Sequence, residues 1–298
     1  MKPAETKFPS AFNPTIAEDK FSHKSWDFIF TRSIIMKSSD LDKLASKFKL
    51  QSIPDVVFDK NICQIKSPIH NFKLEFNAFD SLQLCNFEAR KQTLIEKPDK
   101  SMNVNNINII PTEIQVKHAE VWKNKKPLEN TEIKVLEKIS DCFYSSPYKG
   151  TIQKLDPLGK MDCYCEPTTE DIPINNLKEN NPIIWASMIP LWEDELGDNG
   201  VSNCEFRFRV MNDCFFGLLR HYLRVDEVMI RIYDTRLYHE FEKDYILREF
   251  TVREDNYGGI KTQGFKFGPQ WMTDHGQSFQ VSEFVKVQNC FKEKIFLK

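Results

Sequence analysis

The stretch RVDEVMIRIYDTRLYHE, residues 224–240, decides the fold of this chain. Its apolar residues Val228, Ile230 and Ile232 recur at every second position, which predicts a half-buried β-strand. The alternation stops at 234–236 (Asp-Thr-Arg), and short polar side chains of this kind bond the backbone of turns. We therefore predict that the strand ends there, in a turn.

The segments on either side continue the pattern. Alternation over 206–210 (FRFRV) predicts one strand, and 245–254 (YILREFTVRE) predicts another that forms an antiparallel hairpin with the strand from Val228. Between them, 212–213 (Asn-Asp) resembles a helix N-cap. The buried stripe of the predicted helix consists of Phe215, Leu218, Leu219 and Tyr222.

The rest of the chain divides into shorter elements. Charges and prolines without periodicity predict a mobile tail over 1–24, and further loops are predicted over 97–106 and 256–276. Apolar runs predict strands at 26–35, 56–58, 62–65 and 72–76, the last three as neighbours in one antiparallel sheet. Capping residues and spacing predict helices at 38–48, from 77–80 onward, and at 111–122, with a closing helix or strand within 279–297.

These elements predict an α+β fold in which antiparallel β-sheets pack with several α-helices. Hydrophobic residues make up 41% of the 298 residues, with 24 Phe and 5 Trp, so a sizeable core is available. We expect a single domain over 25–298, in which 97–106 is a polar insertion and 255–298 carries the weakest pattern.

Charge and cysteine usage exclude several classes of protein. Net charge is −2, from 41 basic and 43 acidic residues, and no basic arm stands out, so no nucleic-acid partner is expected. No apolar run is long enough to span a bilayer, so no membrane partner is expected. Eight scattered cysteines without a CxxC pair are typical of reduced thiols, and we predict a cytoplasmic protein without metal or cofactor.

Asp234, Arg236, His239 and Glu240 form the densest polar cluster of the sequence. Asp234, His239 and Glu240 invite the alternative of a hydrolase or metal-dependent enzyme. The chain has no HExxH, GxSxG, P-loop or GxGxxG motif, so we favour an Asp–Arg pair that fixes a turn, with His239 satisfied nearby.

Three further features have a plain structural interpretation. The acidic stretch 193–200 (EDELGDNG) lacks EF-hand spacing, so we interpret it as a solvated loop rather than a calcium site. For Arg207 and Arg209 we favour cross-strand ion pairs over phosphate binding. Cys163 and Cys165 are interpreted as two thiols on one side of a strand rather than as a redox pair.

Longer motifs carry a resemblance to a known family. The stretches 192–203 (WEDELGDNGVSN), 209–227 (RVMNDCFFGLLRHYLRVDE), 230–240 (IRIYDTRLYHE) and 245–254 resemble the TIPRL, or TIP-forty-one-like, proteins. Upstream, the motifs that match in the same order are IIMKSSDLDKLASKFKLQSIPDVVF (34–58), LEFNAFDSL (74–82), VKHAEVW (116–122), YKGT (148–151) and EPTTEDI (166–172). The similarity covers roughly residues 25–255 in register.

The resemblance implies an interaction protein rather than an enzyme. Members of this family bind catalytic subunits of type 2A-like serine/threonine phosphatases, regulate their activity and assembly, and connect to TOR signalling. The implied fold is α+β, and the family is described as holding the phosphatase C-terminal tail in a cleft. Direct binding and binding through an adaptor protein both remain open.

The resemblance also implies interface residues. Carried over by motif, they are Asp80 in LEFNAFDSL, Ile172 in EPTTEDI, and Ile232 and Asp234 in IRIYDTR. Arg236 either pairs with the carboxylate of an incoming tail or braces Asp234, and we favour bracing. For Asp80 a helix N-cap is the alternative to a direct contact.

Overall fold

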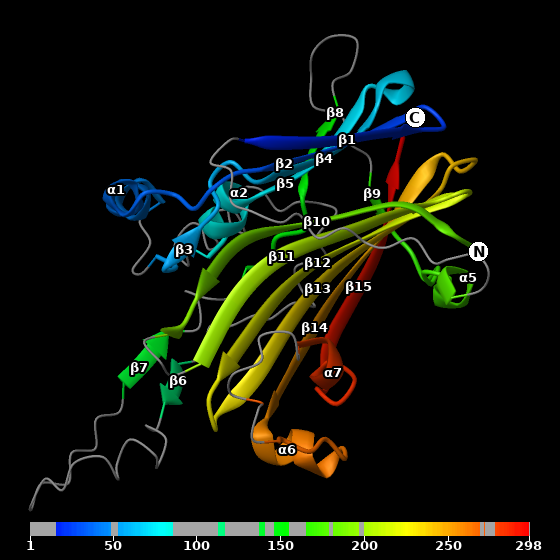
Figure 1. Cartoon of the computed structure of the whole chain (residues 1–298). Coiled ribbons are helices and arrows are strands. Elements are labelled where there is room, and N and C mark those ends of the chain that lie inside the picture. The colour runs from blue at the N-terminus through cyan, green and yellow to red at the C-terminus, as the bar shows by residue number, and fades with distance from the viewer. Residues whose placement is uncertain are drawn as a thin grey trace, which may run out of the picture.

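The fold is a sandwich of two antiparallel sheets (Figure 1). It is seen in a computed structural model that describes residues 16–48, 53–85, 113–116, 137–140, 146–154, 165–178, 181–196, 200–268, 271 and 278–297. The predicted insertion 97–106 lies outside the described residues. Among the residues that the structure describes, none of the helices has the length and apolar composition needed to cross a membrane.

One sheet has five strands. In sheet order they are β1 (Ala17–His23), β2 (Trp26–Arg32), β4 (Ile62–Ser67), β5 (Phe72–Asn77) and β8 (Thr151–Lys154). The predicted strands at 62–65 and 72–76 are confirmed as neighbours, whereas the run at 56–58 contributes to the other sheet.

The larger sheet has eight strands (Figure 1). In sheet order they are β3 (Val56–Val57), β10 (Ile183–Asp194), β11 (Gly200–Met211), β12 (Cys214–Val225), β13 (Met229–Glu240), β14 (Tyr245–Asn256), β15 (Val287–Phe296) and β9 (Cys165–Pro167). A separate two-stranded sheet joins β6 (Glu113–Val116) to β7 (Glu137–Ser140).

Helices are few and mostly short. They are α1 (Ser38–Phe48), α2 (Ala78–Gln83), α5 (Ile174–Lys178), α6 (Tyr257–Thr262) and α7 (Ser278–Val281), with one 3₁₀ turn, η1 (Pro68–His70). The predictions of α1 and α2 are confirmed. The antiparallel sheets are also confirmed, but the helical contribution is smaller than the predicted α+β fold implies.

The predicted helix after 212–213 is wrong, because this segment is the strand β12. β12 pairs along its whole length with β11 on one side and β13 on the other. Ten of its twelve residues are buried, since both faces of the strand are covered. A strand covered on both faces loses the two-residue alternation, so its apolar residues also fit a helical stripe.

The predicted end of the strand at 234–236 is also wrong. β13 continues to Glu240 and pairs with β14 through Tyr238, in the antiparallel hairpin that was predicted. Polar side chains interrupt the apolar pattern without ending the strand, because the neighbouring strands supply charged partners for them.

Two further predictions need correction at the N-terminal side. The predicted tail 1–24 contains β1, which forms a hairpin with β2 through Lys24 and Ser25, both with positive φ (45° and 68°), the conformation that two-residue hairpin turns require. Phe21 stacks on Trp185 at 5.4 Å and fixes β1 to the other sheet. Within the predicted helix 111–122, residues 113–116 form β6, and the remainder lies outside the described residues.

The C-terminal part is more ordered than predicted. The predicted loop 256–276 contains α6, whose N-cap is Asn256. The closing segment 279–297 holds both alternatives, since α7 ends at Val281 and the strand β15 follows.

The main core lies between the two sheets and is largely aromatic. Phe28 and Phe30 of the small sheet face Phe208 and Phe206 of the large sheet, and Phe76 stacks on Phe206 at 4.2 Å. Each fully buried phenylalanine contributes roughly 1.5–3 kcal/mol. The opposite face of the large sheet points away from this core, and we call it the outer face.

Candidate functional site on the outer face

Side chains of β13 alternate between the core and the outer face. Leu237 belongs to the main core, Thr235 donates to the Tyr148 carbonyl at 3.1 Å, and His239 packs on Trp26. Asp234, directly before Thr235 in the alternation, points to the outer face, where it meets Arg220 of β12.

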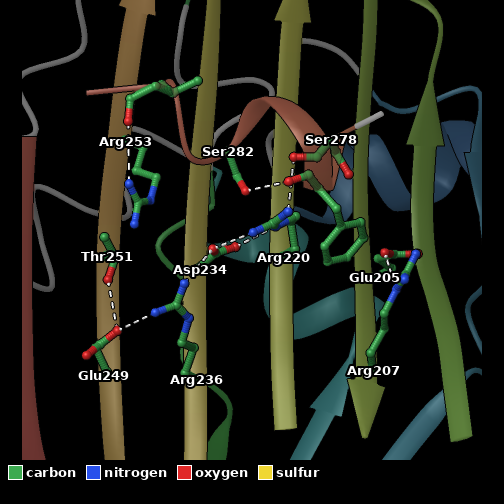
Figure 2. Close-up of polar contacts among 12 residues, drawn as sticks. Glu205, Arg207, Arg220, Asp234, Arg236, Glu249, Thr251, Arg253, Ser278 and Ser282 are labelled. Atoms are coloured by element: carbon green, nitrogen blue, oxygen red, sulfur yellow. Dashed lines mark hydrogen bonds and ion pairs between the residues drawn. The ribbon is translucent and has the colours of Figure 1, made fainter. Parts of the chain in front are cut away.

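Asp234 is the centre of a buried ionic cluster (Figure 2). Arg220 binds its carboxylate in a bidentate manner, with Nε–Oδ1 and Nη2–Oδ2 distances of 2.7 Å each. Arg236 approaches the same carboxylate at 3.7 Å. Asp234 has no exposed surface, so its charge is neutralised within the sheet.

Arg236 extends the cluster toward solvent (Figure 2). Its Nη1 donates to Oε1 of Glu249 at 3.0 Å, and Thr251 donates to the same oxygen at 3.4 Å. The Arg236 side chain is 25% exposed. The contact with Asp234 agrees with the favoured alternative, in which Arg236 braces Asp234, and pairing of Arg236 with an incoming tail stays a prediction.

A continuous row of side chains crosses the outer face. Strand register places its members opposite one another on consecutive strands from β10 to β15. We call this the outer row; it consists of Met188, Arg207, Leu218, Arg236, Glu249 and Lys292. All six side chains are exposed or half-buried, and three are basic against one acidic.

Arg207 and Phe279 shape one part of the row. Arg207 pairs with Glu205 at 2.7 Å, and because both residues lie in β11, the predicted cross-strand pair is wrong for Arg207. The Phe279 ring of α7 lies between the guanidinium groups of Arg207 (4.1 Å) and Arg220 (4.3 Å). This double cation–π contact holds both guanidiniums in place.

Two apolar clusters flank the outer row. The C-terminal cluster consists of Val201, Tyr222, Ile230, Ile232, Ile260, Trp271, Val281 and Val285. The Ile172 cluster consists of Ile172, Met211, Cys214, Tyr238 and Leu247. The outer row is thus a mainly basic, partly exposed band that lies between two buried apolar clusters.

The structure brings together most of the residues implied by the resemblance. Ile232 lies in the C-terminal cluster and Ile172 in the Ile172 cluster, both buried, with Asp234 and Arg236 between them. Asp80 lies apart from them, in α2, where it accepts hydrogen bonds from Asn77 (3.0 Å) and from Thr151.

The N-cap alternative for Asp80 is wrong. Asn77 is the cap of α2, and its side chain accepts the Asp80 N–H at 2.8 Å. Asp80 is the third residue of the helix and accepts from the Asn77 side chain in return. Asn77 is therefore the cap residue, and Asp80 is its partner in a reciprocal pair of hydrogen bonds.

The enzymatic alternative finds no support in this geometry. Asp234 is on the outer face, whereas His239 faces the core, where its Nδ1 contacts the Tyr245 carbonyl at 2.8 Å. Adjacent strand positions keep His239 and Glu240 on opposite faces. No group of three metal-binding side chains occurs among the described residues. Within the acidic stretch 193–200, Asp194 accepts the Leu196 N–H at 2.6 Å and so bonds the backbone of its own loop.

His239 makes the stability of the fold sensitive to acid. Burial lowers the pKa of His239 from 6.5 to about 4, and the bond to the Tyr245 carbonyl offsets only part of that effect. Between these pH values the unfolded chain binds a proton that the folded chain does not. We expect the free energy of unfolding to be unaffected by His239 above pH 6.5 and to fall by about 3 kcal/mol as pH drops to 4.

Urea titrations of the wild type and of His239→Gln at several pH values measure this contribution. The variant lacks the titrating group, so its stability should fall less steeply over the same pH range. Equal slopes for both proteins would show that His239 is not responsible.

Arg220 and Phe279 were missed at the sequence level. The helix predicted over β12 hid the pairing of Arg220 with Asp234. A usable signal was present, since Arg220 interrupts the apolar run 214–219 (CFFGLL), and a charge in such a run implies a partner.

Comparison with known proteins identifies the family. The family model described as "TIP41-like family" matches residues 56–261. The chain belongs to the TIP41-like family. The resemblance stated from the motifs is thereby confirmed, and the matched range contains most of the outer row.

TIP41-like proteins of several eukaryotes align over most of the chain. The rat and human TIP41-like proteins are each 33% identical over 276 residues, which is 92% of this chain and 89% and 88% of theirs. A Saccharomyces cerevisiae protein named "Type 2A phosphatase activator TIP41" is 26% identical over 267 residues, or 85% of this chain and 67% of its own. The TIP41-like family thus includes a protein named as a phosphatase activator.

Proposed function

We propose that this protein is a non-enzymatic regulator that binds the catalytic subunit of type 2A-like serine/threonine phosphatases along the outer row. The main support is its alignment, over 85% of the chain, with a yeast relative named as a type 2A phosphatase activator. The outer row offers a partly exposed surface with three basic side chains, and two buried apolar clusters hold it in place on either side.

The chemistry of the row favours an extended, acidic segment such as the phosphatase C-terminal tail. Arg207 and Arg236 present guanidinium groups that suit carboxylates. Ile172 and Ile232 support the margins of the band from below, and Asp234 holds Arg236 and Arg220 in position. Asp80, which lies in α2, belongs to a separate contact in this proposal.

Binding of this kind regulates the phosphatase by covering part of the surface of its catalytic subunit. A protein held against the catalytic subunit excludes other subunits or shelters the free catalytic subunit, and either effect changes activity or assembly without turnover. We propose that the contact is direct, without an adaptor, and that it serves TOR signalling in the cytoplasm.

A binding titration with purified type 2A catalytic subunit tests this proposal. We expect saturable one-to-one binding by the wild type and at least about tenfold weaker binding by the double variant Arg207→Gln/Arg236→Gln, because two guanidinium contacts are lost. Lys43→Gln is the matched control, since Lys43 is an exposed cation of α1 whose pairing with Asp40 lies outside the outer row.

Thermal melts establish that the variants fold. Unchanged binding by a folded double variant would remove the outer row from the interface. Binding that appears only when a third protein is added would replace direct contact with an adaptor.

A further inference from the structure

The strand β10 forms an edge of the large sheet over most of its length. β3 pairs only with Trp192 and Glu193, at the C-terminal end of β10. From Ile183 to Leu191, no strand in the described part of the chain pairs with β10 on that side. An unpaired strand edge presents N–H and C=O groups that are able to bind another chain.

β10 itself carries no charged side chain over the open part of this edge, although Arg32 and Asp19 of the five-stranded sheet contact Ser187 there. Residues 181–192 (NPIIWASMIPLW) contain no charged side chain, although natural edge strands commonly carry charges against strand pairing. Ile183 is 54% exposed, Ile184 38% and Met188 44%. Exposed aliphatic side chains gathered at one place mark interaction surfaces.

A second segment adds to this apolar surface. Arg32 donates to the Met188 carbonyl at 3.1 Å, and Asn61 connects the Ser33 N–H (2.7 Å) to the Pro190 carbonyl (2.7 Å). The chain after Arg32 therefore runs beside β10. It carries Ile34 and Ile35, 45% and 44% exposed. We call Ile34, Ile35, Ile183, Ile184 and Met188 the apolar edge.

Backbone hydrogen bonding divides β10 into a blocked part and an open part. Side chains of Arg32 and Asn61 occupy the edge-facing carbonyls of Met188 and Pro190. Ala186 is two residues before Met188, so its N–H and C=O point to the same edge. Within the described part of the chain neither group has a hydrogen-bond partner on this edge, so a short strand is able to pair there.

The apolar edge is continuous with the outer row. Met188 is the first member of that row and lies opposite Arg207, and Ala186 lies opposite Arg209. A protein segment bound at Arg207 is therefore one strand away from Met188.

We propose that the apolar edge binds an extended apolar segment of the phosphatase catalytic subunit, which adds as a short strand to β10 beside Ala186. The inference rests on the proposed function, because it assigns a second contact to the same partner. Main-chain hydrogen bonds provide affinity in this mode, and the exposed isoleucines select an apolar segment.

Two variants of the full-length chain test the two halves of the proposal. Ile184→Lys places a charge on the apolar edge, and Ala186→Pro removes the edge-facing N–H. Pro190, four residues away with the same orientation, shows that this edge accommodates proline. We expect each variant to bind purified type 2A catalytic subunit about tenfold more weakly than the wild type.

Ile69→Lys is the matched control. Ile69 is 70% exposed in η1, at the end of the β4–β5 hairpin, and its replacement should leave the affinity within about twofold of the wild type. Thermal melts and sedimentation velocity accompany each titration.

The outcomes separate this inference from the proposed function. Wild-type affinity of folded Ile184→Lys and Ala186→Pro, together with weak binding of the outer-row variant, overturns the apolar edge as a contact and keeps the proposed function. Absence of binding by the wild type overturns both. A wild-type dimer that Ile184→Lys converts to a monomer, with unchanged phosphatase affinity, assigns the edge to a second copy of this chain and also overturns the inference.

Discussion

Replacement of Asp234 by Ala is expected to lower the free energy of unfolding by about 3–5 kcal/mol. Asp234 is fully buried, and its removal leaves the Arg220 guanidinium, itself 3% exposed, without its bidentate partner. Urea denaturation followed by tryptophan fluorescence measures the change. The same variant should weaken the proposed binding to the phosphatase, since Arg236 loses one of its two acidic neighbours.

The control for Asp234→Ala removes both charges. In Asp234→Leu/Arg220→Met, apolar side chains of similar volume fill the site, and most of the lost stability should return. Arg220 also donates to the Ser278 carbonyl at 3.1 Å and stacks on Phe279, so amides of α7 should still exchange faster in the double variant. A loss below about 1 kcal/mol for Asp234→Ala would show that water reaches Arg220 readily.

Replacement of Glu293 by Ala is expected to cost a similar amount, about 3–5 kcal/mol, from the opposite face of the same sheet. Arg248 binds Oε1 of Glu293 through Nε and Nη2 at 2.7 Å each, and Lys149 approaches the same oxygen at 3.7 Å. All three side chains are buried. Removal of the carboxylate therefore leaves two cations inside the sandwich, and urea denaturation measures the cost.

Glu293→Gln separates charge from shape. The amide retains the volume and one acceptor oxygen but not the negative charge, so most of the destabilisation should remain. If Glu293→Gln matched the wild type, the carboxylate would serve only as a hydrogen-bond acceptor.

The strands with one exposed face were predictable from the sequence. β11 keeps a two-residue alternation over most of its length because one face meets the aromatic core and the other meets solvent or polar neighbours. β12 is covered on both faces, so its pattern is compatible with a helix. β1 was not predicted because its single well-packed aromatic residue, Phe21, is surrounded by charged residues.

The candidate site was predictable only in part. Asp234 and Arg236 were identified because polar residues interrupt an apolar pattern. The pattern does not show how neighbouring strands are aligned, and that alignment decides which charged side chains meet. Arg220 therefore remained unassigned, and Asp234 was interpreted as part of a turn. Phe279 reaches the outer row from a segment nearly sixty residues along the chain from Arg220, a contact that no local pattern encodes.

The sheet holds the C-terminal segment partly through the main chain of that segment. Arg220, Arg224 and Arg253 of the sheet donate to the main-chain carbonyls of Ser278, Trp271 and Val285. Every amino acid has a main-chain carbonyl, so these three hydrogen bonds do not depend on the side chain of the residue that accepts them. Replacement of Ser278, which contributes its carbonyl, therefore leaves this attachment intact, whereas replacement of Arg220, Arg224 or Arg253 removes one.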